Sequence, residues 1–68
     1  SIMTYLIVKE IRYETLENDY IIVDKSKDID IANDKLKGYQ LIDTDKDHSY
    51  SLSRYESPFV LREEMRVA

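Results

Sequence analysis

The chain contains no cysteine, so a fold of only 68 residues has to be held together without a disulfide or a thiolate metal site. A chain of about 60 residues buries only about 60% of the surface that its unfolded state exposes. This length therefore predicts one domain over residues 1–68 with one small core, which a partner or a second copy of the chain would help to stabilise. The lack of cysteine also indicates a reducing, cytoplasmic environment.

Apolar residues occur only in short runs. Tyrosine aside, no run exceeds three residues, whereas a helix that spans a bilayer needs about 20. The beginning of the sequence also lacks the basic region and apolar stretch of a signal peptide. We therefore expect neither membrane insertion nor secretion.

The N-terminal part of the sequence predicts an antiparallel hairpin. Apolar and polar residues alternate over Tyr5–Tyr13, and a second β-branched run follows at Tyr20–Val23. The polar residues 14–19 connect the two strands. Leu6 and Val8 make the first half of the first strand apolar on both faces, so we expect a helix or a second subunit to cover it.

A short helix is predicted for residues 28–37. Apolar residues recur there at helical spacing, namely Ile29, Ala32 and Leu36. Asp28 or Ser26 can accept hydrogen bonds from the first turn, and Gly38 can end the helix in a left-handed conformation. The alternation of Asp and Ile over residues 28–31 leaves a strand as the alternative.

A second hairpin is predicted after the helix. Residues 39–42 favour a third strand, residues 43–47 a polar turn, and residues 48–55 a fourth strand. The fourth strand has Tyr50 and Leu52 on one face and three serines on the other, which indicates that one side of the sheet is open to water.

The C-terminal residues allow two structures. Ser57 followed by Pro58 is a helix start signal, so residues 59–67 can form a short helix, or an edge strand whose proline discourages pairing. The predicted fold class is therefore α+β: a small antiparallel sheet of about four strands in the order ββαββ, one short helix, and a C-terminal helix or strand.

The acidic turn invites a metal-binding interpretation. Asp43, Asp45 and Asp47 alternate as they do in calcium loops. Counted from Asp43, however, His48 stands where that loop needs glycine and Arg54 where it needs glutamate. A solvated turn is therefore favoured, and a calcium or ligand site on these aspartates, with His48 as a further ligand, is the alternative function.

No other pattern indicates catalysis or a cofactor. His48 is the single histidine, and its neighbours Asp47 and Ser49 would point to the opposite face of a strand, so these three form a poor catalytic relay. We interpret His48 as an ordinary surface residue. One glycine, Gly38, cannot build a phosphate-binding loop. We therefore expect no enzyme activity and no cofactor.

Six tyrosines are the most unusual count in the composition. Most can be explained by packing in and around the core, and the alternative is an exposed patch, since tyrosine is enriched at interfaces. Stacking on single-stranded nucleic acid is disfavoured, because the net charge is −4 and acids interleave the lysines. Direct binding of nucleic acid is therefore unlikely on electrostatic grounds.

The acids concentrate in the middle of the chain. Residues 19–47 contain eight aspartates and five lysines, a net charge of −3. We predict a non-enzymatic interaction protein, forming a homo-oligomer, that binds a protein partner through its sheet and tyrosine surface. Small phage or mobile-element inhibitors that imitate nucleic acid work in this way. The predicted interaction residues are Tyr39, Tyr50, Tyr55, Phe59, Asp43, Asp45 and Asp47.

Overall fold

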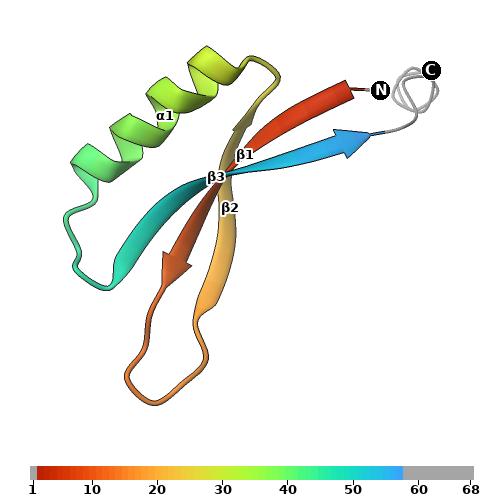
Figure 1. The fold of residues 1–68 in the computed structure, drawn as a ribbon. Coiled ribbons are helices and arrows are strands. Elements are labelled where there is room, and N and C mark those ends of the chain that lie inside the picture. The colour runs from red at the N-terminus through yellow and green to blue at the C-terminus, as the bar shows by residue number, and fades with distance from the viewer. Residues whose placement is uncertain (1, 58–68) are drawn as a thin grey trace.

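The computed structural model describes residues 2–57. Its elements follow the order ββαβ (Figure 1): β1 (Ile2–Ile11), β2 (Asp19–Ser26), α1 (Ile29–Ile42) and β3 (His48–Ser57). The three strands form one antiparallel sheet in the order β2-β1-β3. The α+β class, with an antiparallel sheet and one helix on it, is thereby confirmed.

The central strand β1 presents two unlike faces. Ile7 is completely buried, and Lys9, on the same side of the strand, reaches a carboxylate at the end of α1. Odd-numbered residues of β1 therefore face the helix. Leu6 and Val8 point to the opposite side, because successive side chains of a strand alternate.

The predicted first hairpin is confirmed, with β2 longer than the predicted Tyr20–Val23. The register runs from Ile11 opposite Asp19 to Tyr5 opposite Ser26, and it shifts between Ile7 and Val8. Ile7 pairs with Asp24 and Val8 with Ile22, so Val23 is the extra residue of a bulge. The bulge places Asp24 on the helix side of the sheet, where its carboxylate meets Lys35 at 3.1 Å.

Helix α1 begins as predicted and ends later than predicted. The Asp28 carboxylate accepts hydrogen bonds from the backbone N–H groups of Asp30 at 2.8 Å and Ile31 at 3.1 Å, which confirms Asp28 as the N-cap. The helix continues through Gly38 to Ile42, so the predicted end at Gly38 is wrong. A glycine inside a helix costs only about 1 kcal/mol, which contacts between the helix and the sheet outweigh.

The predicted strand over residues 39–42 is also wrong, because these residues form the last turn of α1. Tyr39 lies seven residues after the buried Ala32, on the same side of the helix, and its hydroxyl reaches Asp24 and the carbonyl of Val23. These contacts between the Tyr39 side chain and β2 favour a helix over residues 39–42, although the local sequence suggests a strand.

Strand β3 confirms the predicted strand over residues 48–55 and extends to Ser57. It pairs with β1 over its whole length, from Ile2 opposite Ser57 to Ile11 opposite His48. The predicted second hairpin and the four-stranded ββαββ sheet are therefore wrong. Strand β3 pairs with the edge of β1 that β2 leaves free, and not with residues 39–42. The helix or strand predicted after Pro58 lies outside the described residues.

One face of the sheet is covered by α1 and the other is not (Figure 1). Within residues 2–57 the fully buried apolar side chains are Ile7 and Ala32. We call the uncovered side the open face, and the pairing assigns the following residues to it: Ile2, Thr4, Leu6, Val8 and Glu10 of β1, Tyr20, Ile22 and Lys25 of β2, and Ser49, Ser51, Ser53, Tyr55 and Ser57 of β3. Within the same residues, no helix is long and apolar enough to cross a membrane.

Candidate functional site

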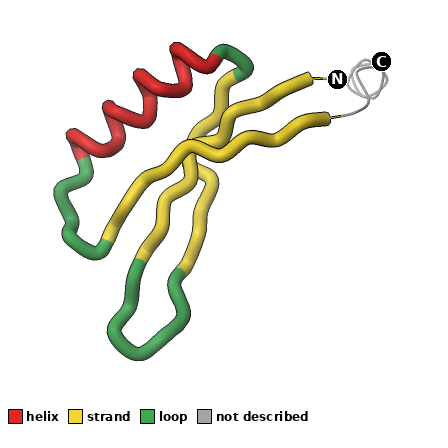
Figure 2. The backbone as a smooth tube through the Cα atoms, viewed as in Figure 1, coloured by secondary structure: helices red, strands yellow, loops and turns green. Residues whose placement is uncertain are grey.

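The acidic loop, residues 43–47, connects the end of α1 to β3 and lies beside the end of β1 (Figure 2). Its aspartates fold it locally. Oδ1 of Asp43 accepts a hydrogen bond from the N–H of Asp45 at 3.1 Å, and Oδ1 of Asp45 accepts one from the N–H of Asp47 at 2.9 Å. These are Asx turns, which the aspartate side chain favours at such positions. The predicted polar turn thus joins a helix to a strand.

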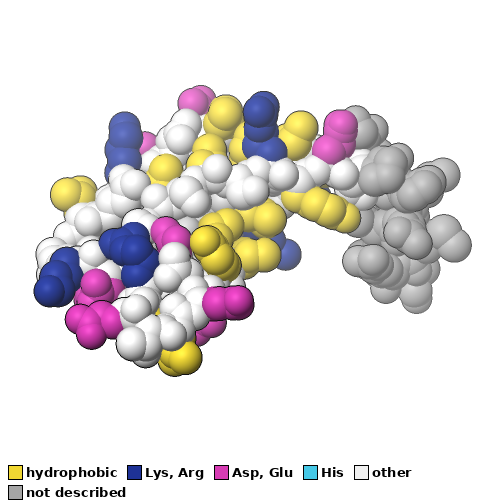
Figure 3. Space-filling view, turned by 60° about the horizontal axis from the view of Figure 1, so that its bottom comes forward, with side chains coloured by type: hydrophobic (Ala, Val, Ile, Leu, Met, Phe, Trp, Pro, Cys, Tyr) yellow, Lys and Arg dark blue, Asp and Glu magenta, His cyan; other side chains and the backbone are white. Residues whose placement is uncertain are grey.

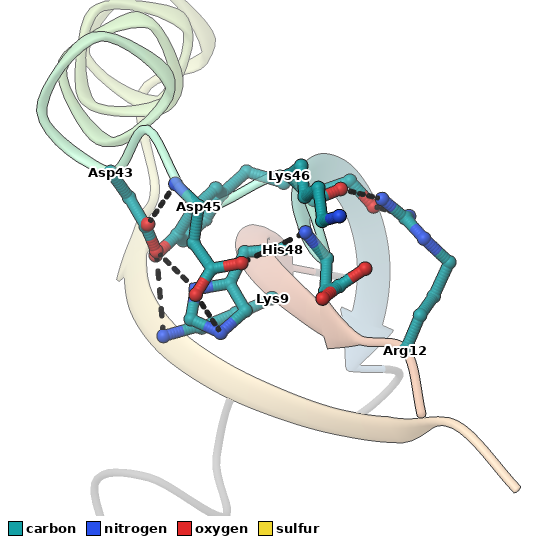
Figure 4. Close-up of polar contacts among 9 residues, drawn as sticks. Lys9, Arg12, Asp43, Asp45, Lys46 and His48 are labelled. Carbon is teal, nitrogen blue, oxygen red and sulfur yellow. Dashed lines mark hydrogen bonds and ion pairs between the residues drawn. The ribbon is translucent and has the colours of Figure 1, made fainter. Parts of the chain in front are cut away.

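The second carboxylate oxygen of Asp43 gathers three side chains (Figure 4). Oδ2 of Asp43 lies 2.5 Å from the hydroxyl of Tyr50, 2.8 Å from Nδ1 of His48 and 3.5 Å from Nζ of Lys9. We call these four residues the Asp43 cluster. The hydrogen bond from Tyr50, followed by those from His48 and the Asp45 N–H, holds the pKa of Asp43 well below its ordinary value.

Two of the predicted interaction residues belong to this internal packing. The rings of Tyr39 and Tyr50 stack with centroids 5.4 Å apart, and Nζ of Lys9 lies 5.9 Å from the Tyr50 centroid. The hydrogen bond to the Asp43 carboxylate, and then burial, raise the pKa of Tyr50. Burial, and then its bond to Asp24, raise the pKa of Tyr39. Both rings therefore serve to seat α1 on the sheet.

Arg12 holds the end of the acidic loop that leads into β3. Its backbone N–H donates to the carbonyl of Asp47 at 2.9 Å, and its guanidinium donates to the carbonyl of Lys46 at 2.6 Å and to the hydroxyl of Ser49 at 3.0 Å. No local sequence pattern indicates a role for Arg12 or Lys9, because their partners lie more than 30 positions away in the chain. Only the pairing of β1 with β3 brings them together.

The three aspartates of the loop do not converge on one point. Asp43 directs its carboxylate into its cluster, while Asp45 lies beside His48 (Figure 4). Among residues 2–57, no group of three His, Cys, Asp or Glu side chains could hold a metal ion. The calcium alternative therefore gains no support from the loop geometry.

His48 is partly enclosed rather than freely exposed, with 21% of its side-chain surface accessible. Its Nδ1 contacts Asp43, and its Nε2 lies 3.6 Å from Oδ2 of Asp45. Ser49 donates instead to Glu10 on the opposite face of the sheet. Both ring nitrogens thus face carboxylates, and the adjacent serine lies on the other side of the strand, as expected for alternating side chains.

The end of the helix carries the most exposed large apolar side chains of the described residues. Leu41 is 79% exposed and Ile42 85%. They directly precede the acidic loop, in which Asp45 and Asp47 are also exposed. We call Leu41, Ile42, Asp45 and Asp47 the helix-end corner.

The predicted interaction residues therefore do not form one surface. Asp45 and Asp47 lie at the helix-end corner, whereas Asp43, Tyr39 and Tyr50 are engaged internally. Tyr55 is 57% exposed, but it lies on the open face toward the other end of β3. Phe59 is outside the described residues. Exposed apolar side chains also lie among charged ones elsewhere on the surface (Figure 3).

Comparison with known proteins finds no matching family model, no similar curated protein and no similar solved structure.

Proposed function

We propose that this protein acts without catalysis, by docking its helix-end corner onto a basic surface of another protein. The observation that carries the proposal is the exposure of Leu41 and Ile42, at 79% and 85%, immediately before an acidic loop. Adjacent apolar side chains left in water beside charged ones are typical of protein interfaces, where an apolar centre is surrounded by a polar rim.

The charge of the corner indicates the chemistry of the partner. The whole chain carries −4, and Asp45 and Asp47 place two of the acids next to the exposed apolar pair. A partner surface with an apolar recess bordered by lysine or arginine would complement it and would be attracted over a distance. Proteins that bind nucleic acid carry such basic surfaces. Nucleic acid itself would be repelled by the same acids.

The contacts beneath the corner support a docking role. The Asx turns, the Asp43 cluster and the hydrogen bonds from Arg12 hold the acidic loop in one conformation. A loop that is already ordered loses less conformational entropy on binding, so more of the contact energy appears as affinity.

The test is affinity capture from source cells with matched variants. The wild-type chain should retain a basic protein that added salt releases. Asp45→Asn/Asp47→Asn and, separately, Leu41→Ser/Ile42→Ser should lose it. The control is Glu14→Gln/Glu17→Gln, which removes the same charge from exposed positions in the loop between β1 and β2.

Unchanged retention by the corner variants would overturn the proposal, as would the absence of any captured protein. Circular dichroism of each variant confirms that the fold is intact, so that a loss of binding reports on the corner alone.

A further inference from the structure

The open face leaves apolar side chains in water at the centre of the sheet. Val8 of β1 lies there opposite Ile22 of β2, which is 61% exposed, and Leu6 lies opposite Lys25. Leu6 and Val8 are themselves partly buried. Tyr20, at 67% exposure, and Tyr55, at 57%, flank this centre. The helix packs on the other side, so nothing within residues 2–57 covers these side chains.

The open face is also poor in acids although the chain is acidic. Its acid is Glu10, whose carboxylate lies 3.6 Å from the Arg12 guanidinium and accepts hydrogen bonds from Asn18, Tyr20 and Ser49. Its lysine is Lys25, which lies opposite Leu6 on the edge strand β2. The middle of β3 contributes serines rather than charges. The helix α1, with its acids Asp30 and Asp34, lies on the other side of the sheet (Figure 1). Each copy therefore brings few charged side chains to a contact between two open faces: Glu10, which is already paired with Arg12, and Lys25.

The edges of the sheet are less accessible than the open face. A backbone hydrogen bond joins Arg12 to Asp47, so even-numbered residues of β3 direct their carbonyls away from β1. The carbonyl of Tyr50 accepts a bond from Gln40 of α1 at 3.3 Å. At the other edge the carbonyl of Lys25 accepts one from Lys35 at 3.1 Å. Strand addition at either edge would have to displace helix side chains.

We infer that the open face binds the open face of a second copy of this chain. The product is a two-fold sandwich of two three-stranded sheets with a helix on each outer side, a packing that twisted sheets adopt at about 30°. Strand dimensions make each face about 33 Å long and about 14 Å wide, or about 460 Å² in outline. Two such outlines add up to about 920 Å², close to the lower bound of about 1,000 Å² for a specific interface.

A second copy fits better than an unrelated partner because the cover is needed for folding. Only Ile7 and Ala32 are fully buried apolar residues in the described chain, and a core of that size leaves little net stability. A second copy is present whenever the chain is made, and a two-fold interface needs only one self-complementary surface. This inference uses a different surface from the helix-end corner, which remains free in the dimer.

The experiment combines mass measurement with cysteine protection on the full chain, which has no cysteine of its own. Sedimentation equilibrium should give twice the monomer mass of 8.1 kDa. Ser51→Cys, in the middle of the open face, should react with a thiol reagent about tenfold more slowly in concentrated than in dilute solution, because dilution dissociates the dimer. Thr44→Cys, exposed in the acidic loop, is the control and should react rapidly at every concentration.

A charged variant provides a second measurement. Ser51→Lys should shift the mass to that of a monomer, whereas Thr44→Lys, with the same change in charge, should leave the dimer intact. Three results would overturn the inference: a monomer at every concentration, a dimer in which Ser51→Cys reacts as fast as Thr44→Cys, or a monomer in which Ser51→Cys stays protected on dilution. The last would mean that the same chain covers its own open face.

Discussion

The hydroxyl of Tyr50 donates a hydrogen bond of 2.5 Å to Oδ2 of Asp43, joining the beginning of β3 to the C-cap residue of α1. The same oxygen also contacts His48 and Lys9. One carboxylate thus ties the helix to two strands of the sheet, and it holds the acidic loop close to the helix-end corner.

Asp43→Asn should destabilise the fold in a pH-dependent way. The pKa of Asp43 is lowered in the folded chain, chiefly by the bond from Tyr50. A lowered pKa stabilises the fold above the ordinary value of 3.8, and this stabilisation is lost as the pH falls below that value. Urea denaturation should therefore show the largest difference between wild type and variant at neutral pH, and a shrinking difference in acid.

The control for that series is Asp34→Asn, which makes the same substitution at an exposed aspartate of α1. A difference between wild type and Asp43→Asn that stays constant from neutral to acidic pH would show that the carboxylate charge does not act in this way.

Tyr50 should ionise later than an ordinary tyrosine. Its pKa is raised by the bond to Asp43, so its contribution to stability is complete below about pH 10 and is lost as the pH rises through the raised value. In an alkaline titration followed by tyrosinate absorbance, tyrosines with a raised pKa ionise in a late phase, at the highest pH. Tyr50→Phe should remove part of this late phase, to which Tyr13 and Tyr39 also contribute. Loss of amplitude from the early phase instead would contradict the assignment.

Gly38→Ala should stabilise the protein by about 0.5–1 kcal/mol. Gly38 lies inside α1 without a positive φ, and an added Cβ would meet no atom within 4 Å. The gain should appear in urea or thermal unfolding at a fixed protein concentration. Destabilisation by the alanine would instead place residue 38 at a left-handed helix end, as the sequence pattern predicted.

Ile7→Ala should cost about 2–5 kcal/mol, since Ile7 is completely buried between α1 and the sheet. Ile42→Ala provides the comparison, because the Ile42 side chain is 85% exposed and its loss should change stability by no more than about 0.5 kcal/mol. Equal effects of the two substitutions in urea denaturation would argue against Ile7 as the centre of the core.

Local patterns were sufficient for the first hairpin, for the N-cap at Asp28 and for the strand that starts at His48. Each depends on neighbouring residues: alternation over β1, a carboxylate within reach of the next two or three N–H groups, and a polar turn before β3. The same reasoning placed Tyr50 and Leu52 on one face of their strand and the serines on the other, in agreement with the register.

The candidate site was predicted only in part. The alternating aspartates predict an acidic loop at residues 43–47, but nothing in the sequence distinguishes the three aspartates from one another. In the structure Asp43 is enclosed by Tyr50 and His48, whereas Asp45 and Asp47 stay exposed. Leu41 and Ile42 were assigned to a strand, so their exposure beside the loop could not be foreseen.

By itself, the sequence determined the α+β class, the absence of disulfides, the net charge of −4 and the start of the helix. Only the tertiary structure decided that α1 runs through Gly38 to Ile42, that β3 pairs with β1, and that Lys9 and Asp43 meet. The reason is the range of the interactions: caps and alternating side chains act over a few residues. Helix length and strand partners depend on contacts between residues more than ten positions apart, and these contacts can outweigh local preferences, which amount to no more than about 1 kcal/mol per residue.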